Sequence, residues 1–169
     1  MDRLVDCTVI SNFAAAGCLP LLRDVAGPLH LASEVYDEIL GGRLSGYDFY
    51  DGIEQHISPL SQSGWLYLVA MTEDELRLSA ELPSTLHRGE GACLCMARQR
   101  GWGLLTDDRA ARKQAVRWGI SVSGTLGVLL LGVQVKRITV EEGNAILGSM
   151  VDRANYRSPV ADLRALIST

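Results

Sequence analysis

The sequence predicts a three-layer α/β/α fold around a mainly parallel central sheet. Short apolar runs without polar alternation, such as WLYLVAM at 65–71, indicate strands that are covered on both faces. These runs alternate with longer segments of helical periodicity, an order that is typical of βαβ units. A chain of 169 residues suits one domain with a substantial core. In such a sheet a ligand binds beyond the carboxyl ends of the strands, so the residues at those ends are the first candidates for function.

The first half of the chain divides into strands and helices at recognisable signals. Ser33 is a predicted helix N-cap, and Thr72 is followed by three acids, as at the start of a helix. Residues 46–64 are predicted to form a mixed, helical segment that ends at the turn SQSG. The predicted strands are 3–6, 28–32 and 65–71, and the predicted helices are 11–25 (broken near Pro20), 33–43 and 72–82.

The helices of the second half can be located from their capping residues. Gly101 and Gly119 close two predicted helices, and Thr139 with Glu142 forms a capping box at the start of another. The predicted strands are 102–106 and 120–124, and the predicted helices are 89–100, 108–119, 125–135, one that begins near 138, and a short one at 160–167.

Composition and charge exclude several classes of protein. The net charge of −4 argues against binding of nucleic acid through bulk positive charge, but is compatible with a local basic patch. Charged residues interrupt the first six positions, so the start does not resemble a signal peptide. The apolar run at 124–135 is too short to span a bilayer. We therefore expect a cytoplasmic protein without a membrane partner.

The four cysteines are expected to be reduced thiols that pack as small hydrophobic side chains. Cys93 and Cys95 stand two residues apart in a predicted helix, where such positions do not face each other. None of the three histidines falls at the spacing of zinc ligands. The sequence therefore does not predict a zinc site.

Carboxylates stand where the pattern predicts burial. Asp6 ends the first strand, and Asp107 and Asp108 follow a later strand, so all three map to the same edge of the sheet. Glu38 and Glu90 lie on the apolar stripes of two helices. Carboxylates that cluster without compensation raise one another's pKa values. A site with oxygen ligands alone suits a hard cation, so the pattern predicts Mg²⁺ or Mn²⁺.

Three of these acids also have an ordinary structural explanation. Asp108 is a good N-cap for the helix that follows it. Glu38 is a solvated residue if the helical register shifts by one, and Glu90 complements the dipole of its own helix. The joint pattern favours the cation site, because the acids come from four segments and no histidine base or nucleophile motif accompanies them.

Four blocks of residues, in order, resemble those of the PIN-domain family. They are VDCTVISN with Asp6 and Thr8, LHLASEVYDEIL with Glu38, RGEGACLCMA with Glu90 and Ala97, and LLTDDRAAR with Thr106 and Asp108. The resemblance covers residues 3–135. This fold is that of many metal-dependent ribonucleases, including VapC-type toxins.

Three further segments resemble one subgroup of the family. They are a G-E-x-x-A block at 89–93, a DD-x-x-A-R block at 107–112 and G-T-L-G-V-L at 124–129. The first departs from the pattern at its last position, where Cys93 stands in place of the alanine. The chain is also longer than the compact toxins at 46–82 and after 136. We therefore expect a single PIN-like domain over 1–169, with its core motifs in 3–135 and a C-terminal helical extension at 136–169.

The resemblance implies a metal-dependent ribonuclease and assigns its site residues. Asp6, Glu38, Glu90 and Asp108 would be the catalytic acids that hold one or two Mg²⁺ or Mn²⁺ ions. The cation would activate water for in-line attack on an RNA phosphodiester and neutralise charge on the phosphate.

Three residues beside the acids have supporting or open roles. Thr8 would hydrogen-bond the scissile phosphate or a ligand carboxylate, and Thr106 would orient Asp108. Asp107 has an open role, as a metal ligand, as a support for the ligands, or as a solvated residue.

A basic helix face follows the last acid. Arg109, Arg112 and Lys113 share one side of the helix by their spacing and are predicted to bind RNA. A solvated face with ordinary ion pairs is the alternative explanation. For a toxin, the resemblance also implies a small cognate antitoxin as a protein partner. It further implies a homodimer, for which the apolar residues 126–135 are either the contact or part of the core.

Two other functions compete with the ribonuclease. A phosphate-handling α/β enzyme would use Asp6 as a phosphorylated nucleophile, but the haloacid-dehalogenase-like pattern needs a second Asp where Thr8 stands. A non-cleaving PIN-like protein would bind nucleic acid or act as a scaffold. The presence of all four acids argues against such a degenerate site.

Overall fold

The structure, a computed structural model that describes residues 1–167, contains a central sheet of parallel strands. Their order across the sheet is β3-β4-β2-β1-β5-β6, so β1 lies in the interior next to β2 and β5. Because the strands run in one direction, their carboxyl ends share one edge of the sheet. The strands are β1 (Arg3–Val5), β2 (Leu29–Ala32), β3 (Ile57–Ser58), β4 (Leu66–Val69), β5 (Gly103–Leu105) and β6 (Val122–Ser123).

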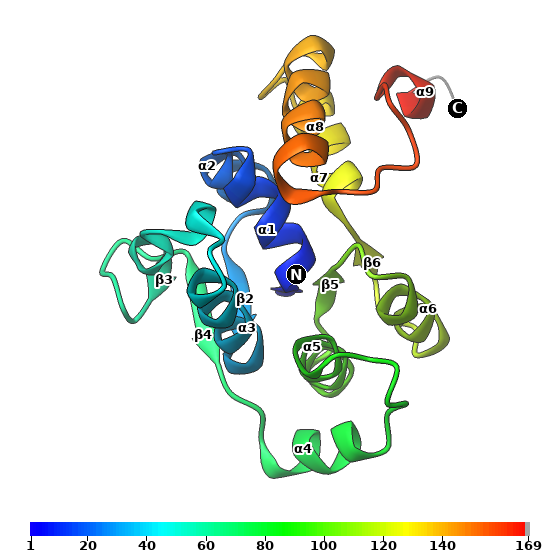
Figure 1. Cartoon of the computed structure of the whole chain (residues 1–169). Coiled ribbons are helices and arrows are strands. Elements are labelled where there is room, and N and C mark those ends of the chain that lie inside the picture. Colours follow the sequence, from blue (N-terminus) through cyan, green and yellow to red (C-terminus); the bar gives the residue numbers. More distant parts are fainter. Residues whose placement is uncertain (168–169) are drawn as a thin grey trace.

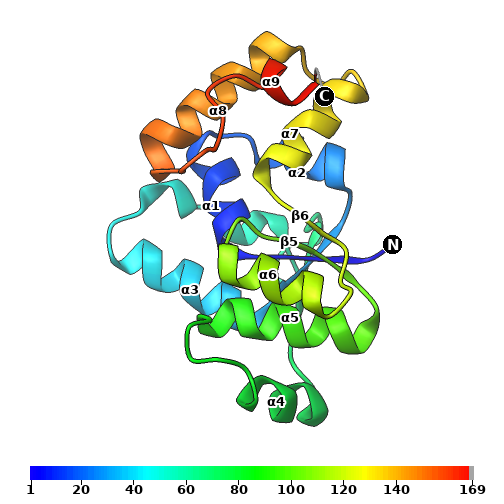
Figure 2. The same ribbon diagram turned by 90° about the vertical axis from the view of Figure 1, so that its right-hand side faces the viewer.

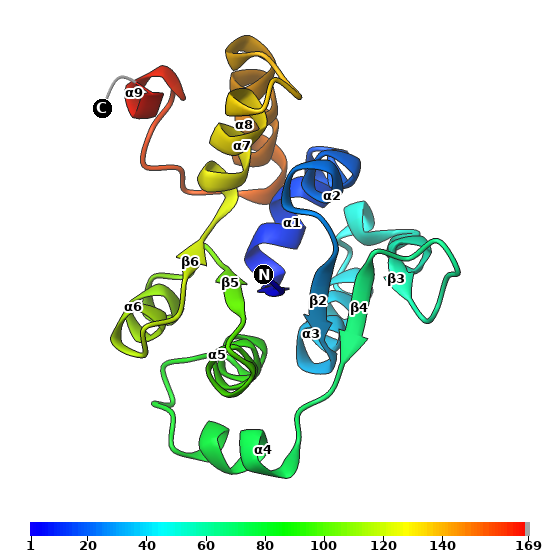
Figure 3. The same ribbon diagram turned by 180° about the vertical axis from the view of Figure 1, so that it is seen from behind.

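Helices cover both faces of this sheet, which confirms the expected three-layer α/β/α fold. One side carries α1 (Cys7–Ala15), α2 (Leu19–Ala26), α7 (Thr125–Gln134) and α8 (Val140–Ala154) (Figure 1). The other side carries α3 (Ser33–Leu44), α4 (Glu73–Ala80), α5 (Arg88–Arg100) and α6 (Arg109–Arg117) (Figure 2). The view from behind shows the same division (Figure 3). A last short helix, α9 (Arg164–Ile167), ends the described chain.

Several caps form as the sequence predicts. Thr72 with Glu75, and Thr139 with Glu142, make reciprocal capping boxes at the starts of α4 and α8. Gly101 closes α5 in the left-handed conformation, with φ of +67°, which glycine adopts without the steric cost of a Cβ.

Other boundaries differ from the prediction for local reasons. The helix expected at 11–25 is two helices, because Pro20 occupies the first turn of α2, where its missing N–H costs nothing. The first of them, α1, begins at Cys7, since the Asp6 side chain caps it. Ser33 is wrong as an N-cap: β2 runs directly into α3, and Ala32 takes the cap position without a side-chain hydrogen bond.

The segment 46–64 is only partly helical. It contains two short 3-10 helices, η1 (Asp48–Tyr50) and η2 (Ile53–His56), and then the edge strand β3. A strand of two residues has no periodicity that the sequence could display. Its pairing with β4 extends the sheet by one position at the edge far from β1.

One hydrophobic core joins the layers. Leu4 and Val5 of β1 and Phe13 of α1 are fully buried, and Met150 of α8 and Leu163 belong to the same core cluster. The C-terminal helices therefore pack on the same core as the sheet. Cys93 and Cys95 are buried free thiols, and Cys7 and Cys18 are free and partly exposed. No helix within residues 1–167 is long and apolar enough to cross a membrane.

Candidate active site

Asp6 lies at the carboxyl end of β1 and is only 1% exposed. One carboxylate oxygen accepts a hydrogen bond from the Cys7 N–H at 2.7 Å, which caps α1. The other accepts from the hydroxyls of Thr8 at 3.1 Å and Thr106 at 2.7 Å. Burial raises the pKa of Asp6 to about 6, the three hydrogen bonds lower it in part, and the charge of Glu38 raises it further. A positive charge beside Asp6 would therefore stabilise the ionised form of this buried carboxyl group.

The two threonines connect Asp6 to the chain that follows β5. The Thr8 hydroxyl accepts a hydrogen bond from the Asp107 N–H at 3.1 Å, and the Thr106 hydroxyl accepts from the Asp108 N–H at 3.2 Å. Each hydroxyl therefore accepts from one of two consecutive backbone amides and donates to the same oxygen of Asp6. This arrangement fixes the orientation of Asp6 relative to Asp108.

Asp108 begins α6 at the same edge of the sheet. Its carboxylate accepts a hydrogen bond from the Ala111 N–H at 2.7 Å, so Asp108 is the helix N-cap that its position suggests. This contact uses one of its two carboxylate oxygens.

Glu90 stands in the first turn of α5 and is 6% exposed. It accepts a hydrogen bond from the His87 N–H at 2.9 Å and thereby caps its own helix. Burial raises the pKa of Glu90 to about 7, and the charges of Asp6 and Asp108 add to that rise while the hydrogen bond opposes it. Glu90 therefore lies in the electrostatic field of two other acids of the set.

Glu38 comes from α3, which packs beside α5. Its carboxylate accepts a hydrogen bond from the Gly89 N–H at 2.8 Å. That N–H belongs to the first turn of α5, where the backbone has no helical acceptor of its own. Glu38 is thus held at the amino end of the helix that carries Glu90.

These acids form one electrostatic group at the carboxyl edge of the sheet. The charge of Glu38 acts on Asp6, and the charges of Asp6 and Asp108 act on Glu90. In the described part of the chain, however, no three His, Cys, Asp or Glu side chains are arranged to hold a metal ion.

The donor set nevertheless fits a hard divalent cation. One oxygen each of Glu38, Glu90 and Asp108 accepts a protein hydrogen bond, and the described residues give the other no such partner. Burial and mutual repulsion also make positive charge favourable there. Rotation of these side chains would be needed to bring the free oxygens together.

Asp107 has a different environment from Asp108. Its carboxylate accepts hydrogen bonds from the Thr125 N–H at 2.9 Å, the Thr125 hydroxyl at 2.5 Å and the Asn12 amide at 3.1 Å. A Cβ at position 124 would overlap this carboxylate, so Gly124 lets α7 begin there. In this structure Asp107 anchors α7 and α1 to the end of β5.

The three residues of the predicted basic face of α6 have different environments. Arg112 is partly exposed, donates to the Thr106 carbonyl at 2.9 Å and lines one of the cavities beside Asp107. Arg109 is exposed and lines the cavities beside Asp108. Lys113 is exposed and lines neither of these cavities.

Sequence reasoning missed several residues that support the acids. Asn12 is 4% exposed and connects Asp107 to Thr125 through its amide group. A polar residue on the apolar side of a helix, one turn after Thr8, is a signal that could have found it. Tyr50 of η1 is 3% exposed and hydrogen-bonds with Ser11 on α1. Nothing in the local pattern around Tyr50 predicts that contact.

A comparison with protein-family models gave a match over almost the whole chain. The family model described as DUF3368: PIN domain matches residues 3–168. A search of curated proteins found no match.

Proposed function

The chain belongs to the PIN-domain family, and on that premise we propose that it is a metal-dependent ribonuclease that hydrolyses RNA phosphodiester bonds. PIN domains are generally nucleases and typically use divalent metals. The observation that carries the proposal is the environment of Asp6. This carboxyl group is buried, its pKa is raised to about 6, and Glu38 and Glu90 lie in its electrostatic field. A fold does not by itself provide an activity, so the argument rests on this site.

We assign the acids to the binding of Mg²⁺ or Mn²⁺. Asp6, Glu38, Glu90 and Asp108 would hold the ion, which supplies activation of a water molecule and neutralisation of charge on the phosphate. Asp6 lies at the end of β1, an interior strand of the sheet. Glu90 and Asp108 each occupy a helix start, and their capping hydrogen bonds hold one oxygen while the other stays available.

Thr8 and Thr106 serve as positioning residues in this proposal. Both hydroxyls donate to Asp6 and accept from the backbone, so neither has a donor left for substrate. They restrict the Asp6 carboxylate to one orientation and favour its ionised form.

The decisive experiment compares cleavage of a labelled RNA pool with Mn²⁺ and with EDTA. Wild type is expected to cleave only with the metal. Asp6→Asn and Asp108→Asn are expected to lose cleavage while circular dichroism shows an unchanged fold. Asp152→Asn, an exposed acid on α8, is the matched control and keeps full activity. Wild-type cleavage rates in both site variants would overturn the assignment.

The same experiment separates the competing functions. Binding of Mn²⁺ in calorimetry, without cleavage of any RNA pool, would identify a scaffold. Formation of acid-labile phosphate with a phosphoryl donor would identify Asp6 as a nucleophile.

We further propose that the ribonuclease is the toxin of a toxin–antitoxin pair. A small antitoxin with an Arg or Lys side chain would fit the acidic group, because such a cation compensates the same carboxylates. Expression of the chain alone should arrest growth, and co-expression with the product of the adjoining gene should relieve it. Growth at the normal rate in both cases would exclude the toxin role while leaving the chemistry intact.

A further inference from the structure

Two adjoining cavities open beside the acids, on the side of α1, α6 and α8. Their volumes are about 480 and 520 Å³. Both are lined by Asp107, Arg109, Tyr156 and Arg157, so they lie side by side, and together they are called the groove. The smaller cavity is also lined by Thr8 and Asp108, which places one end of the groove at the proposed active site.

The far wall of this groove is the segment 155–163, which links α8 to α9. It begins with a reversal at Asn155, whose φ of +53° is left-handed, and whose N–H closes α8 on the Met150 carbonyl. The Tyr156 N–H donates to the same carbonyl at 3.2 Å, and its ring packs against the hydrophobic core. The turn therefore brings Arg157 to the groove, and the contact of the partly buried Tyr156 ring with the core holds this part of the segment in place.

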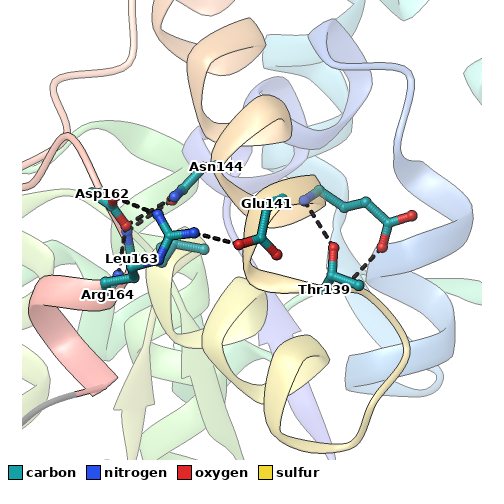
Figure 4. A network of polar contacts seen from close by, with 7 residues as sticks. Thr139, Glu141, Asn144, Asp162, Leu163 and Arg164 are labelled. Carbon is teal, nitrogen blue, oxygen red and sulfur yellow. Dashed lines mark hydrogen bonds and ion pairs between the residues drawn. The ribbon is translucent and has the colours of Figure 1, made fainter.

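The other end of the segment is fixed as firmly. Asn144 of α8 donates to Asp162 at 2.8 Å and accepts from the Leu163 N–H at 2.8 Å (Figure 4). Arg164 pairs with Asp162 and with Glu141 (Figure 4). Leu163 is fully buried. The segment that supplies Arg157 is thus held at both ends.

Arg109 and Arg157 face the groove from elements far apart in the sequence. Both side chains are exposed, and within residues 1–167 neither forms an ion pair or a side-chain hydrogen bond. Asp107 also lines the groove, but within residues 1–167 it forms no ion pair with either arginine, and its two oxygens accept hydrogen bonds from Thr125 and Asn12. Arg109 and Arg157, with Arg112 in the larger cavity, thus line a groove that begins at an acidic site.

We propose that this groove holds the single-stranded RNA next to the scissile bond, and that Arg109 and Arg157 bind its phosphates. The inference rests on the proposed function and deepens it, since it names the form of the substrate and a residue of the C-terminal segment that recognises it. Guanidinium groups are suited to phosphate because their planar donors match its oxygens. Cavities of this volume accommodate individual nucleotides, which a single strand can place in them one at a time.

The test measures binding without catalysis. The probe is a short fluorescein-labelled oligouridylate, followed by fluorescence anisotropy in EDTA at several salt concentrations. Arg109→Gln and Arg157→Gln are each expected to weaken binding several-fold. Each should also reduce the slope of log affinity against log salt by about 0.7, the value for one lost phosphate contact on a single strand. The same strand annealed to oligoadenylate should bind wild type more weakly.

Arg153→Gln is the matched control, because Arg153 is exposed on the last turn of α8 and lines neither cavity. It should bind the probe as wild type does. Wild-type affinity in Arg157→Gln would overturn the inference. So would an equal loss in Arg153→Gln, duplex binding at least as tight as that of the single strand, or no binding by wild type at low salt. A chain that binds through Arg157 but does not cleave with Mn²⁺ would contradict the proposed function alone. Cleavage that is unaffected by Arg157→Gln would contradict only the proposed role of the groove in binding RNA.

Discussion

The carboxylate of Glu38 accepts a hydrogen bond from the Gly89 N–H at 2.8 Å, and a Cβ at position 89 would lie 2.8–2.9 Å from that same carboxylate. The glycine thus provides both the donor and the space that Glu38 occupies. The contact joins α3 to the amino end of α5, where Glu90 follows directly in sequence. A single small residue therefore determines how two of the proposed catalytic acids lie relative to each other.

Gly89→Ala should reduce cleavage strongly while the protein stays folded. The new methyl group displaces the Glu38 carboxylate, which is the flexible end of a side chain, so the clash is relieved locally. Alanine also favours the helix over glycine by about 1 kcal/mol, which offsets the lost hydrogen bond. We expect at least about a tenfold fall in Mn²⁺-dependent cleavage, because small displacements of catalytic groups cost up to about 10²-fold. Urea unfolding should show a stability within about 1 kcal/mol of wild type.

Gly148→Ala on α8 is the control for that substitution. A Cβ at this position meets nothing within 4 Å. It should stabilise the protein by about 0.5–1 kcal/mol and leave cleavage unchanged. Equal activity in both alanine variants would show that Glu38 does not need its present position.

Thr106→Val should affect both stability and the pH profile. Valine has a similar shape but removes the donor to Asp6 and the acceptor for the Asp108 N–H. Thr106 is fully buried, so the unpaired groups should cost about 1–3 kcal/mol of unfolding free energy. The Thr106 hydrogen bond lowers the pKa of Asp6, and its loss should move the acid limb of the cleavage profile to higher pH. Thr106→Ser keeps the hydroxyl and should restore the wild-type limb; an unshifted limb in the valine variant would contradict this role.

Asp107→Ala should destabilise the protein without weakening its affinity for Mn²⁺. The substitution removes the acceptor for three hydrogen bonds from Thr125 and Asn12, which should cost about 1–3 kcal/mol. Calorimetry on the folded variant tests the second part. A large loss of Mn²⁺ affinity with little change in stability would instead make Asp107 a ligand.

The sequence is informative where a residue's role is local. Asp6 and Asp108 could be located because each stands where a strand ends and a helix begins, and the carboxyl ends of parallel strands share an edge. The capping boxes at Thr72 and Thr139 could be predicted for the same reason, since all their partners lie within four residues. The wrong cap at Ser33 marks the limit: its residue type is favourable, but the direct passage from β2 into α3 leaves it inside the helix.

Contacts between segments that are distant in the sequence could not be predicted in this way. The bond between Glu38 and Gly89 depends on how α3 packs on α5, and neither residue shows it locally. The hydrogen bond from Arg112 to the Thr106 carbonyl could not be predicted from helical spacing, because that spacing places Arg112 on the same side of the helix as Arg109 and Lys113. Arg157 reaches the groove only because Asn155 reverses the chain and Asn144 holds the segment beyond it.

The metal-free protein should be less stable at pH 8 than at pH 5. The pKa of Asp6 is raised from 3.8 to about 6 and that of Glu90 from 4.5 to about 7, so the folded state binds more protons than the unfolded state between these values. Stability therefore falls as the pH rises through the folded pKa values. For Asp6 alone the loss between pH 5 and pH 8 is about 1.4 kcal/mol, because the folded pKa of about 6 lies one pKa unit above pH 5. Urea unfolding in EDTA at both pH values measures it, and Asp6→Asn should flatten the dependence.

Mn²⁺ should reverse that pH dependence. The cation binds the ionised carboxylates and not their protonated forms, so its stabilising effect should be larger at pH 8 than at pH 5. Unfolding repeated with saturating Mn²⁺ should then give a higher midpoint at pH 8 for wild type, and a much smaller gain for Asp6→Asn. A gain that is equal at the two pH values, or equal in the two proteins, would mean that Mn²⁺ binds elsewhere. The raised pKa values of Asp6 and Glu90 would then reflect burial alone.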